Sequence, residues 1–155
     1  MPSYYRDPEA PPPNVPRRVG VTALIERDGV LLVERRADDN TWAFIGGWLE
    51  ENETLLEALH REVREETGFA IEHATLFGLF SDPTRVIAYP DGNICRLASV
   101  AFRVIPARSV APVLSDESLE MRFVSIDELA ALDFWPVHRP IRDAVVTGHR
   151  EIVIE

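Results

Sequence analysis

Residues 47–69 read GWLEENETLLEALHREVREETGF, and this stretch determines how the rest of the chain is interpreted. The periodic apolar positions within it predict a helix over about residues 54–67. Thr54 and Glu57 fit a capping box at the start of this helix, and Gly68 fits the left-handed position just past its end. One face of the helix is therefore apolar, and the opposite face is charged.

The charged face brings three carboxylates together. Glu62 and Glu66 lie one turn apart on the same face, with Glu65 beside them. Like charges at this spacing repel, whereas a divalent cation such as Mg²⁺ takes oxygen ligands and offsets the repulsion. Arg61 can hold Glu65 in an ion pair, and Glu53 can fold back to the same Arg61. A metal site explains this pattern better than a solvated glutamate-rich surface helix, which is what most charge runs are.

The whole stretch matches the Nudix box, whose pattern is Gly, five residues, Glu, seven residues, Arg-Glu, apolar, any, Glu-Glu, any, Gly, apolar. All 23 positions fit, so the chain resembles a Nudix hydrolase. The resemblance implies an α/β (α+β) fold, the Nudix α/β/α sandwich with a mixed β-sheet between helices. It also implies hydrolysis of a nucleoside diphosphate linked to another group, with Mg²⁺ or Mn²⁺ as cofactor. The motif indicates this chemistry but no particular substrate.

The resemblance also assigns the metal ligands. Glu62 and Glu66 would hold one or more ions, which would neutralise the diphosphate and lower the pKa of the attacking water. The carbonyl of Gly46, just before the motif, would be a further ligand. The expected metal ligands are Gly46, Glu62, Glu65, Glu66 and Glu117.

The general base has several candidates. Glu65 belongs to the helix itself, while Nudix enzymes often use a glutamate of a late loop, some six residues before an aromatic position. Counting back from Phe123 indicates Glu117, with Glu120 as its rival, and a solvated acidic loop over residues 115–120 is the alternative. The expected catalytic residues are Glu65, Glu117, Arg61 and Glu53, of which the last two support the helix geometry.

Arginine and aromatic side chains near the motif are candidates for substrate binding. Arg35 and Arg36 end a predicted strand, where an arginine often faces the substrate in Nudix relatives. An ion pair of either arginine with Asp38 or Asp39 is the alternative. Trp48 follows the double glycine and could stack on a nucleobase. The expected substrate-binding residues are Arg35, Arg36, Trp48 and Tyr89.

The rest of the chain predicts a mostly β-structure around the motif helix. Residues 19–26 and 30–35 predict a hairpin across Asp28-Gly29. His138, near the last predicted helix, is expected to be structural rather than catalytic. The remaining expected elements are a strand over 70–80 broken at Gly78, a hairpin of 86–89 and 94–105, a strand over 121–126, a short helix ending at 132, a helix over 136–147 and a terminal strand within 151–155.

Two segments differ in composition. Residues 1–17 hold six of the twelve prolines and predict an extended N-terminal arm, lying either on its own domain or on a partner subunit. Tyr4 and Tyr5 are the expected anchors of a docked arm. Residues 18–155 predict a single Nudix hydrolase domain. A homodimer is an option that the sequence leaves open.

Composition excludes several classes of protein. The net charge of −10 argues against a nucleic-acid-binding surface, and the chain contains no lysine. There is no run of about 18 apolar residues and no signal-like start, so we expect a soluble, cytoplasmic protein with no membrane partner. The single cysteine, Cys95, cannot form an internal disulfide.

The expected partner is a small-molecule nucleotide. ADP-ribose or a nucleoside diphosphate sugar fits best, because two arginines and several aromatics could hold both ends of a long ligand. Nucleoside triphosphates, as substrates of a house-cleaning pyrophosphohydrolase, come second, and capped RNA comes third because the chain is acidic. A nucleotide sensor without catalysis is the non-enzymatic alternative. Such a sensor usually lacks a glutamate of the box, whereas this chain retains them all.

Overall fold

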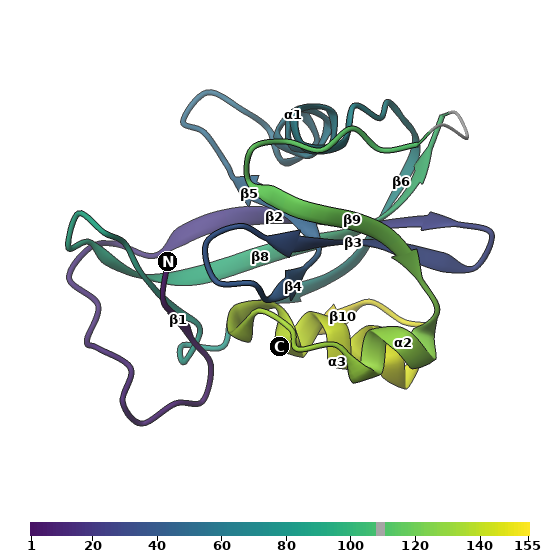
Figure 1. Cartoon of the computed structure of the whole chain (residues 1–155). Coiled ribbons are helices and arrows are strands. Elements are labelled where there is room, and N and C mark those ends of the chain that lie inside the picture. The colour runs from purple at the N-terminus through teal and green to yellow at the C-terminus, as the bar shows by residue number, and fades with distance from the viewer. Residues whose placement is uncertain (108–110) are drawn as a thin grey trace.

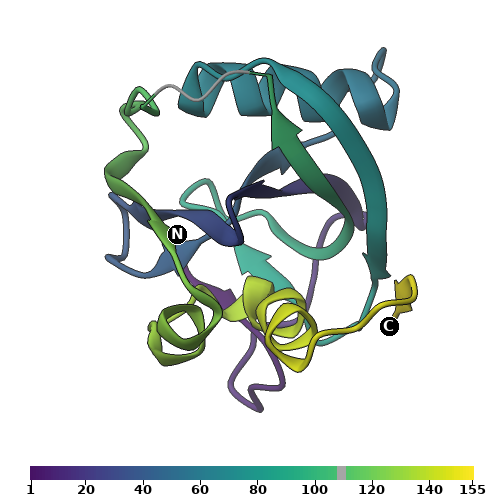
Figure 2. The same ribbon diagram turned by 90° about the vertical axis from the view of Figure 1, so that its right-hand side faces the viewer.

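A mixed β-sheet forms the centre of the molecule, with helices on both of its faces (Figure 1). The computed structural model describes residues 1–107 and 111–155. Helix α1 (Leu55–Thr67) covers one face, and α2 (Ile126–Ala131) and α3 (Arg139–Thr147) cover the other, as the rotated view also shows (Figure 2). This arrangement confirms the predicted mixed sheet between helices. No helix in these described ranges is long and apolar enough to cross a membrane.

Strand β2 lies at the centre of the sheet, and the other strands are arranged around it. They are β1 Ser3–Tyr4, β2 Arg18–Arg27, β3 Val30–Arg36, β4 Trp42–Ala43, β5 Ile45–Trp48, β6 Ile71–Phe80, β7 Val86–Ala88, β8 Ile94–Pro106, β9 Ser118–Val124 and β10 Val153–Ile154. Strand β2 runs parallel to β8 and antiparallel to β5 and β3. Strand β8 also pairs with β6 and β7, and β3 pairs with β4 and β9. Strand β5, which runs through the double glycine, was not predicted.

Both ends of α1 are capped as the sequence predicts. The Thr54 hydroxyl accepts a hydrogen bond from the Glu57 N–H, and the Glu57 carboxylate accepts one from the Thr54 N–H at 2.8 Å. Gly68 adopts φ 75° and donates its N–H to the Arg64 carbonyl at 2.9 Å. The helix packs on the sheet through a buried stripe that includes Ala58, Leu59 and Val63. Leu56, which is also apolar, lies outside this stripe and is 52% exposed.

Strand β6 and the last predicted helix differ from the predictions. Strand β6 continues through Gly78, with an irregular register there instead of a break. Gly78 is needed because a Cβ would lie 2.7 Å from the Val153 carbonyl of the neighbouring β10. The predicted helix over 136–147 is divided into a 3-10 turn, η1 (Pro136–His138), and α3. Pro140 lies in the first turn of α3, where its missing N–H costs no hydrogen bond.

The N-terminal arm lies on its own domain. Strand β1 pairs antiparallel with β7, and the Asn14 carboxamide oxygen accepts a hydrogen bond from the Ile94 N–H at 2.8 Å. Val15 packs against the apolar cluster formed by β7, β8 and η1. The Tyr5 hydroxyl contacts the Glu155 carboxylate at 3.1 Å. The arm therefore forms an additional edge of the sheet.

Arg85 is a buried cation that joins three parts of the fold. Its side chain is fully buried and donates to the carbonyls of Val137 (2.9 Å) and Phe80 (2.6 Å) and to the Ser99 hydroxyl (2.8 Å). Burial lowers the pKa of Arg85 to about 10, so the guanidinium stays charged at neutral pH. These bonds link the end of β6 and strand β8 to η1, which carries part of the cavity described below.

We expect Arg85→Met to lower the free energy of unfolding by about 3 kcal/mol, because three buried acceptors would lose their donor. Urea denaturation monitored by circular dichroism measures this loss. The matched control is Arg64→Met, since Arg64 is exposed on α1. Equal stabilities for the two variants would contradict the structural role of Arg85.

Candidate active site

A cavity of about 420 Å³ lies where α1, β2, β5 and η1 meet. One end is acidic, and the other is lined by aromatic, apolar and arginine side chains. The acidic end contains Glu34, Glu62, Glu66 and Glu117, and the opposite end includes Arg18, Trp48, Ile87, Leu97, Trp135 and His138. A ligand that carries a charged centre and a planar group would match this division.

Two glycines allow the backbone to approach the acidic end closely. A Cβ at position 46 would collide with the Val21 carbonyl of β2, and one at position 47 would collide with the Glu62 carboxylate. Gly46 and Gly47 both line the cavity. Only glycine therefore leaves room for Glu62 between α1 and β5.

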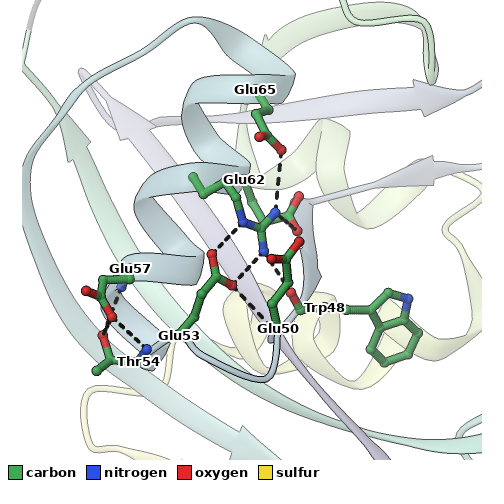
Figure 3. A network of polar contacts seen from close by, with 8 residues as sticks. Trp48, Glu50, Glu53, Thr54, Glu57, Glu62 and Glu65 are labelled. Atoms are coloured by element: carbon green, nitrogen blue, oxygen red, sulfur yellow. Dashed lines mark hydrogen bonds and ion pairs between the residues drawn. The ribbon is translucent and has the colours of Figure 1, made fainter.

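Arg61 holds the loop before α1 against the helix through a network of polar contacts, whose partners Trp48, Glu53, Glu62 and Glu65 are labelled in Figure 3. Its guanidinium donates two hydrogen bonds to the Glu53 carboxylate, at 2.6 and 2.8 Å, and one to the Trp48 carbonyl at 3.0 Å. It also contacts Glu62 at 2.7 Å and Glu65 at 3.4 Å. The hydrogen bond from Arg61 lowers the pKa of Glu53. Arg61 and Glu53 thus fix the position of the loop relative to the helix, and Arg61 also lines the cavity.

Glu66 is the carboxylate with the least favourable surroundings. It is 8% exposed, and its Oε2 atom has no hydrogen-bond partner among residues 1–107 and 111–155. Burial, followed by the charges of Glu34, Glu62 and Glu117, raises the pKa of Glu66 to about 9. Such a group requires a nearby positive charge to be ionised at neutral pH. The oxygen-rich surroundings fit Mg²⁺ or Mn²⁺, which prefer hard oxygen ligands.

The carboxylates converge without forming a complete coordination shell. In the described part of the chain, no three His, Cys, Asp or Glu side chains have the arrangement of a metal site. Glu62 is held by Arg61, and Glu65 is 61% exposed and does not line the cavity. A divalent ion at this site would therefore compete with Arg61 for the Glu62 carboxylate.

The three candidate bases occupy different places. Glu117 lines the cavity and acts electrostatically on Glu62 and Glu66. Glu120 lies outside it, within β9, and pairs with Arg35 at 3.5 Å. Strand β9 begins three residues earlier than predicted, so only part of the expected acidic loop is irregular. Of the three, Glu117 alone lies beside the acidic end of the cavity.

The two arginines at the end of β3 also separate. Arg36 lines the cavity, pairs with Asp38 at 2.8 Å and lies 4.1 Å above the ring of Trp135. Arg35 is absent from the cavity lining and pairs with Glu120. A substrate in the cavity can therefore contact Arg36 but not Arg35.

Trp48 and Tyr89 both lie beside Arg18, with their ring centroids 6.2 Å apart. The Arg18 guanidinium is 4.3 Å from the Trp48 ring and donates to the Tyr89 hydroxyl at 3.3 Å. Trp48 lines the cavity, whereas Tyr89 lines a smaller depression between the N-terminal arm and the β7–β8 turn. Arg18 borders both spaces, and the sequence analysis did not identify it.

Three further cavity residues were not expected to belong to the site. Trp135 and His138, on and beside η1, each bury a ring nitrogen that lacks a hydrogen-bond partner. Glu34 lies on β3, facing α1. Strand alternation places it on the same face as the buried Leu32, and a glutamate at such a position was the available signal. For Trp135 and His138, 66 residues or more from Glu66 in the sequence, no local signal existed.

A family model, described as the NUDIX domain, matches residues 16–145. The chain belongs to the Nudix hydrolase family. The match covers the helix α1, the double glycine and all five acidic residues that line the cavity, Glu50 included. Members of this family act on small nucleotide substrates and generally use divalent metal ions.

Individual relatives agree with this assignment. A MutT-like protein of Streptomyces ambofaciens is 36% identical over 107 residues, which are 69% of this chain and 62% of that protein. An ADP-ribose pyrophosphatase of Methanocaldococcus jannaschii is 31% identical over 119 residues, 75% of this chain and 66% of that protein. This Nudix chain thus spans slightly under two thirds of the length of these relatives. The crystal structure of a MutT Nudix hydrolase from Burkholderia pseudomallei superimposes with a TM-score of 0.65, at 26% identity, over 88% of this chain and all of that one.

We expect His138 to make the Nudix domain less stable in acid. Burial lowers the pKa of His138 well below its ordinary 6.5, so below that pH the unfolded chain binds a proton that the folded chain does not. The free energy of unfolding then decreases as the pH is lowered, by up to about 1.4 kcal/mol per pH unit. Buried carboxyls whose pKa is raised have the opposite effect, so the comparison must be with His138→Gln.

Urea denaturation at pH 7.5, 6.5 and 5.5 tests this contribution. Relative to wild type, His138→Gln should gain stability as the pH falls. The control is His73→Gln on the exposed side of β6. A stability difference between His138→Gln and wild type that does not change with pH would contradict the expectation.

Proposed function

We propose that this Nudix protein hydrolyses the diphosphate linkage of a nucleoside diphosphate derivative of the ADP-ribose or nucleotide-sugar type, with Mg²⁺ or Mn²⁺. The observation that carries the proposal is the divided cavity. Its buried, unpartnered Glu66 lies among other carboxylates at one end, and aromatic and arginine side chains line the other. The acidic end suits the cation and diphosphate, and the aromatic end suits a nucleoside.

The residues of the acidic end would have different roles in the hydrolysis. Glu62 and Glu66, with the Gly46 carbonyl, would hold the divalent ion. When bound, the ion supplies positive charge to the diphosphate and acidifies water at the site. Glu117 accepts a proton as the water oxygen bonds to one phosphorus. The bond from that phosphorus to the bridging oxygen breaks, which gives a nucleoside monophosphate and a phosphorylated remainder.

Two arginine side chains that line the cavity, Arg18 and Arg36, would bind the substrate. Arg36 lies in the cavity near the acidic end, and its stacking on Trp135 fixes the orientation of its guanidinium. Arg18 extends over Trp48 at the opposite wall. Neither cation belongs to the Arg61 network. Arg36 is paired with Asp38 at 2.8 Å, so it would bind phosphate oxygens or a sugar through the N–H groups that this pair leaves, and Arg18 would bind them from its place over Trp48. Two separated cations favour a ligand with two ends.

Two other functions need to be tested. A nucleoside triphosphate pyrophosphohydrolase is the second candidate, which the similarity to a MutT-like protein supports. A non-catalytic nucleotide sensor is the third, and the complete set of box glutamates argues against it. The similarity to an ADP-ribose pyrophosphatase supports the first candidate.

A substrate panel distinguishes these functions. Product release is measured with Mg²⁺, with Mn²⁺ and with EDTA, on ADP-ribose, nucleoside diphosphate sugars, dinucleoside polyphosphates, nucleoside triphosphates and capped RNA. We expect metal-dependent cleavage concentrated on ADP-ribose or nucleotide sugars. Preference for triphosphates would support the second candidate instead. Binding of a nucleotide without any cleavage would support the sensor.

Glu66→Gln should reduce turnover about 1,000-fold or more, because the variant loses the buried charge that would bind the metal. The fold should persist, since the amide has the same shape and relieves repulsion among the carboxylates. Steady-state kinetics with Mg²⁺ and circular dichroism measure the two effects. Glu72→Gln, exposed on β6, is the control. A Glu66→Gln enzyme with most of its activity would show that the assignment is wrong.

Glu117→Gln and Glu120→Gln form a matched pair that tests the general base. The first variant should lower kcat 100-fold or more, in the usual range of ~10²–10⁴ for a general base. The second should leave kcat unchanged, because Glu120 pairs with Arg35 outside the cavity. Kinetics across pH 6 to 9 provide the measurement. The reverse ranking would assign the role to Glu120, and two active variants would indicate Glu65.

A further inference from the structure

Glu34 is a buried carboxylate at a position where an apolar side chain would be expected. It lies on β3, outside the Nudix motif, and is only 6% exposed. Its neighbour on the same face of the strand, Leu32, is completely buried in the apolar layer beneath α1. An apolar side chain at position 34 would extend this layer, whereas a buried acid costs free energy unless it has a specific partner.

The hydrogen bonds around Glu34 satisfy only part of this requirement. The Ser118 hydroxyl donates to its Oε2 atom and thereby joins β3 to the start of β9. Arg36 is the cation that acts on Glu34, but its guanidinium is already paired with Asp38 at 2.8 Å. The bond from Ser118 therefore orients the Glu34 carboxylate without neutralising it.

Glu34 also faces the least stable acid of the site. Among the charged neighbours of Glu66, Glu34 acts on it most strongly, ahead of Glu62 and Glu117. Glu66 belongs to α1 and Glu34 to the sheet, so the two carboxylates approach the cavity from opposite layers. The Oε2 atom of Glu66 is buried without a partner. Two buried acids that face each other in this way are compatible when a cation lies between them.

We propose that Glu34 is a ligand of the divalent cation, so that the ion is held between strand β3 and helix α1. Ser118 positions this carboxylate, and Glu62 and Glu66 supply the ligands from the helix. The inference rests on the metal-dependent function proposed above and adds a ligand from outside the motif. The alternative is a structural acid that only joins β3 to β9 through Ser118.

The test is metal binding by Glu34→Gln. The amide keeps the shape of the side chain and an oxygen that can accept from Ser118, but it removes the charge. Metal-stripped wild type and variant are titrated with MnCl₂ and with MgCl₂ in a calorimeter, and their unfolding temperatures are measured with and without each ion.

We expect the Kd for both ions to rise by about 10-fold or more in Glu34→Gln, at least as large as the loss seen when outer partners of a metal site are removed. The metal-free variant should unfold at a higher temperature than wild type, because one repelling charge is gone. Its stabilisation by the ion should be smaller. Ser118→Ala, which frees the carboxylate without removing it, should weaken binding to a lesser degree.

Glu72→Gln is the matched control, since it removes one glutamate charge from an exposed position on β6. It should bind both ions like wild type. Unchanged affinity in Glu34→Gln would overturn the role of Glu34 as a ligand while leaving a metal-dependent wild-type hydrolase intact. No binding of either ion by wild type would overturn both this inference and the proposed function.

Discussion

The bidentate ion pair between Arg61 and Glu53 is the interaction on which the site depends. It fastens the loop after β5 to the outer face of α1, and the same guanidinium reaches the Trp48 carbonyl. Leu49 is the apolar residue of this loop, and it packs on the cluster beneath α1. Because one arginine also contacts Glu62, the position of the loop and the direction of a cavity carboxylate are coupled.

The charged residues of α1 lie on the face of the helix that is directed away from the sheet. Packing of its apolar face on the sheet stabilises the helix. The opposite face can therefore carry charged groups that repel one another. Glu66, at the boundary of the two faces, is nine-tenths buried and has the largest upward shift in pKa among the acids of the cavity. Stability of the fold and reactivity of the site are thus assigned to opposite sides of one helix.

Local patterns in the sequence were sufficient for the elements whose causes are local. The capping box at Thr54, the left-handed Gly68 and the β2–β3 hairpin were all predictable, because each depends on residues within one or two turns of chain. Strand β5 was not, since its two glycines carry no β-branched side chain and are required by close contact with β2 and Glu62. The buried Arg85 was missed for a related reason, because two of its acceptors, Ser99 and Val137, lie 14 and 52 residues away in the sequence.

The site divides in the same way. Motif spacing was enough to place Glu62 and Glu66 together, but the register of β9 against β3 determines which late glutamate faces them. The aromatic end is beyond local prediction, since Trp135 and His138 reach the cavity only after the chain has crossed the sheet and turned back through η1.

The docked N-terminal arm has a consequence for the behaviour of the protein in solution. An uncovered edge strand presents a row of free N–H and C=O groups that can recruit a strand from another molecule. Here β1 occupies the outer side of β7, and the segment around Asn14 caps the beginning of β8. The N-terminal arm therefore blocks this edge of β7 against pairing with a strand of another molecule. A shortened chain that begins at β2 would leave the edge of β7, next to the cavity, open to pairing with a strand of another molecule.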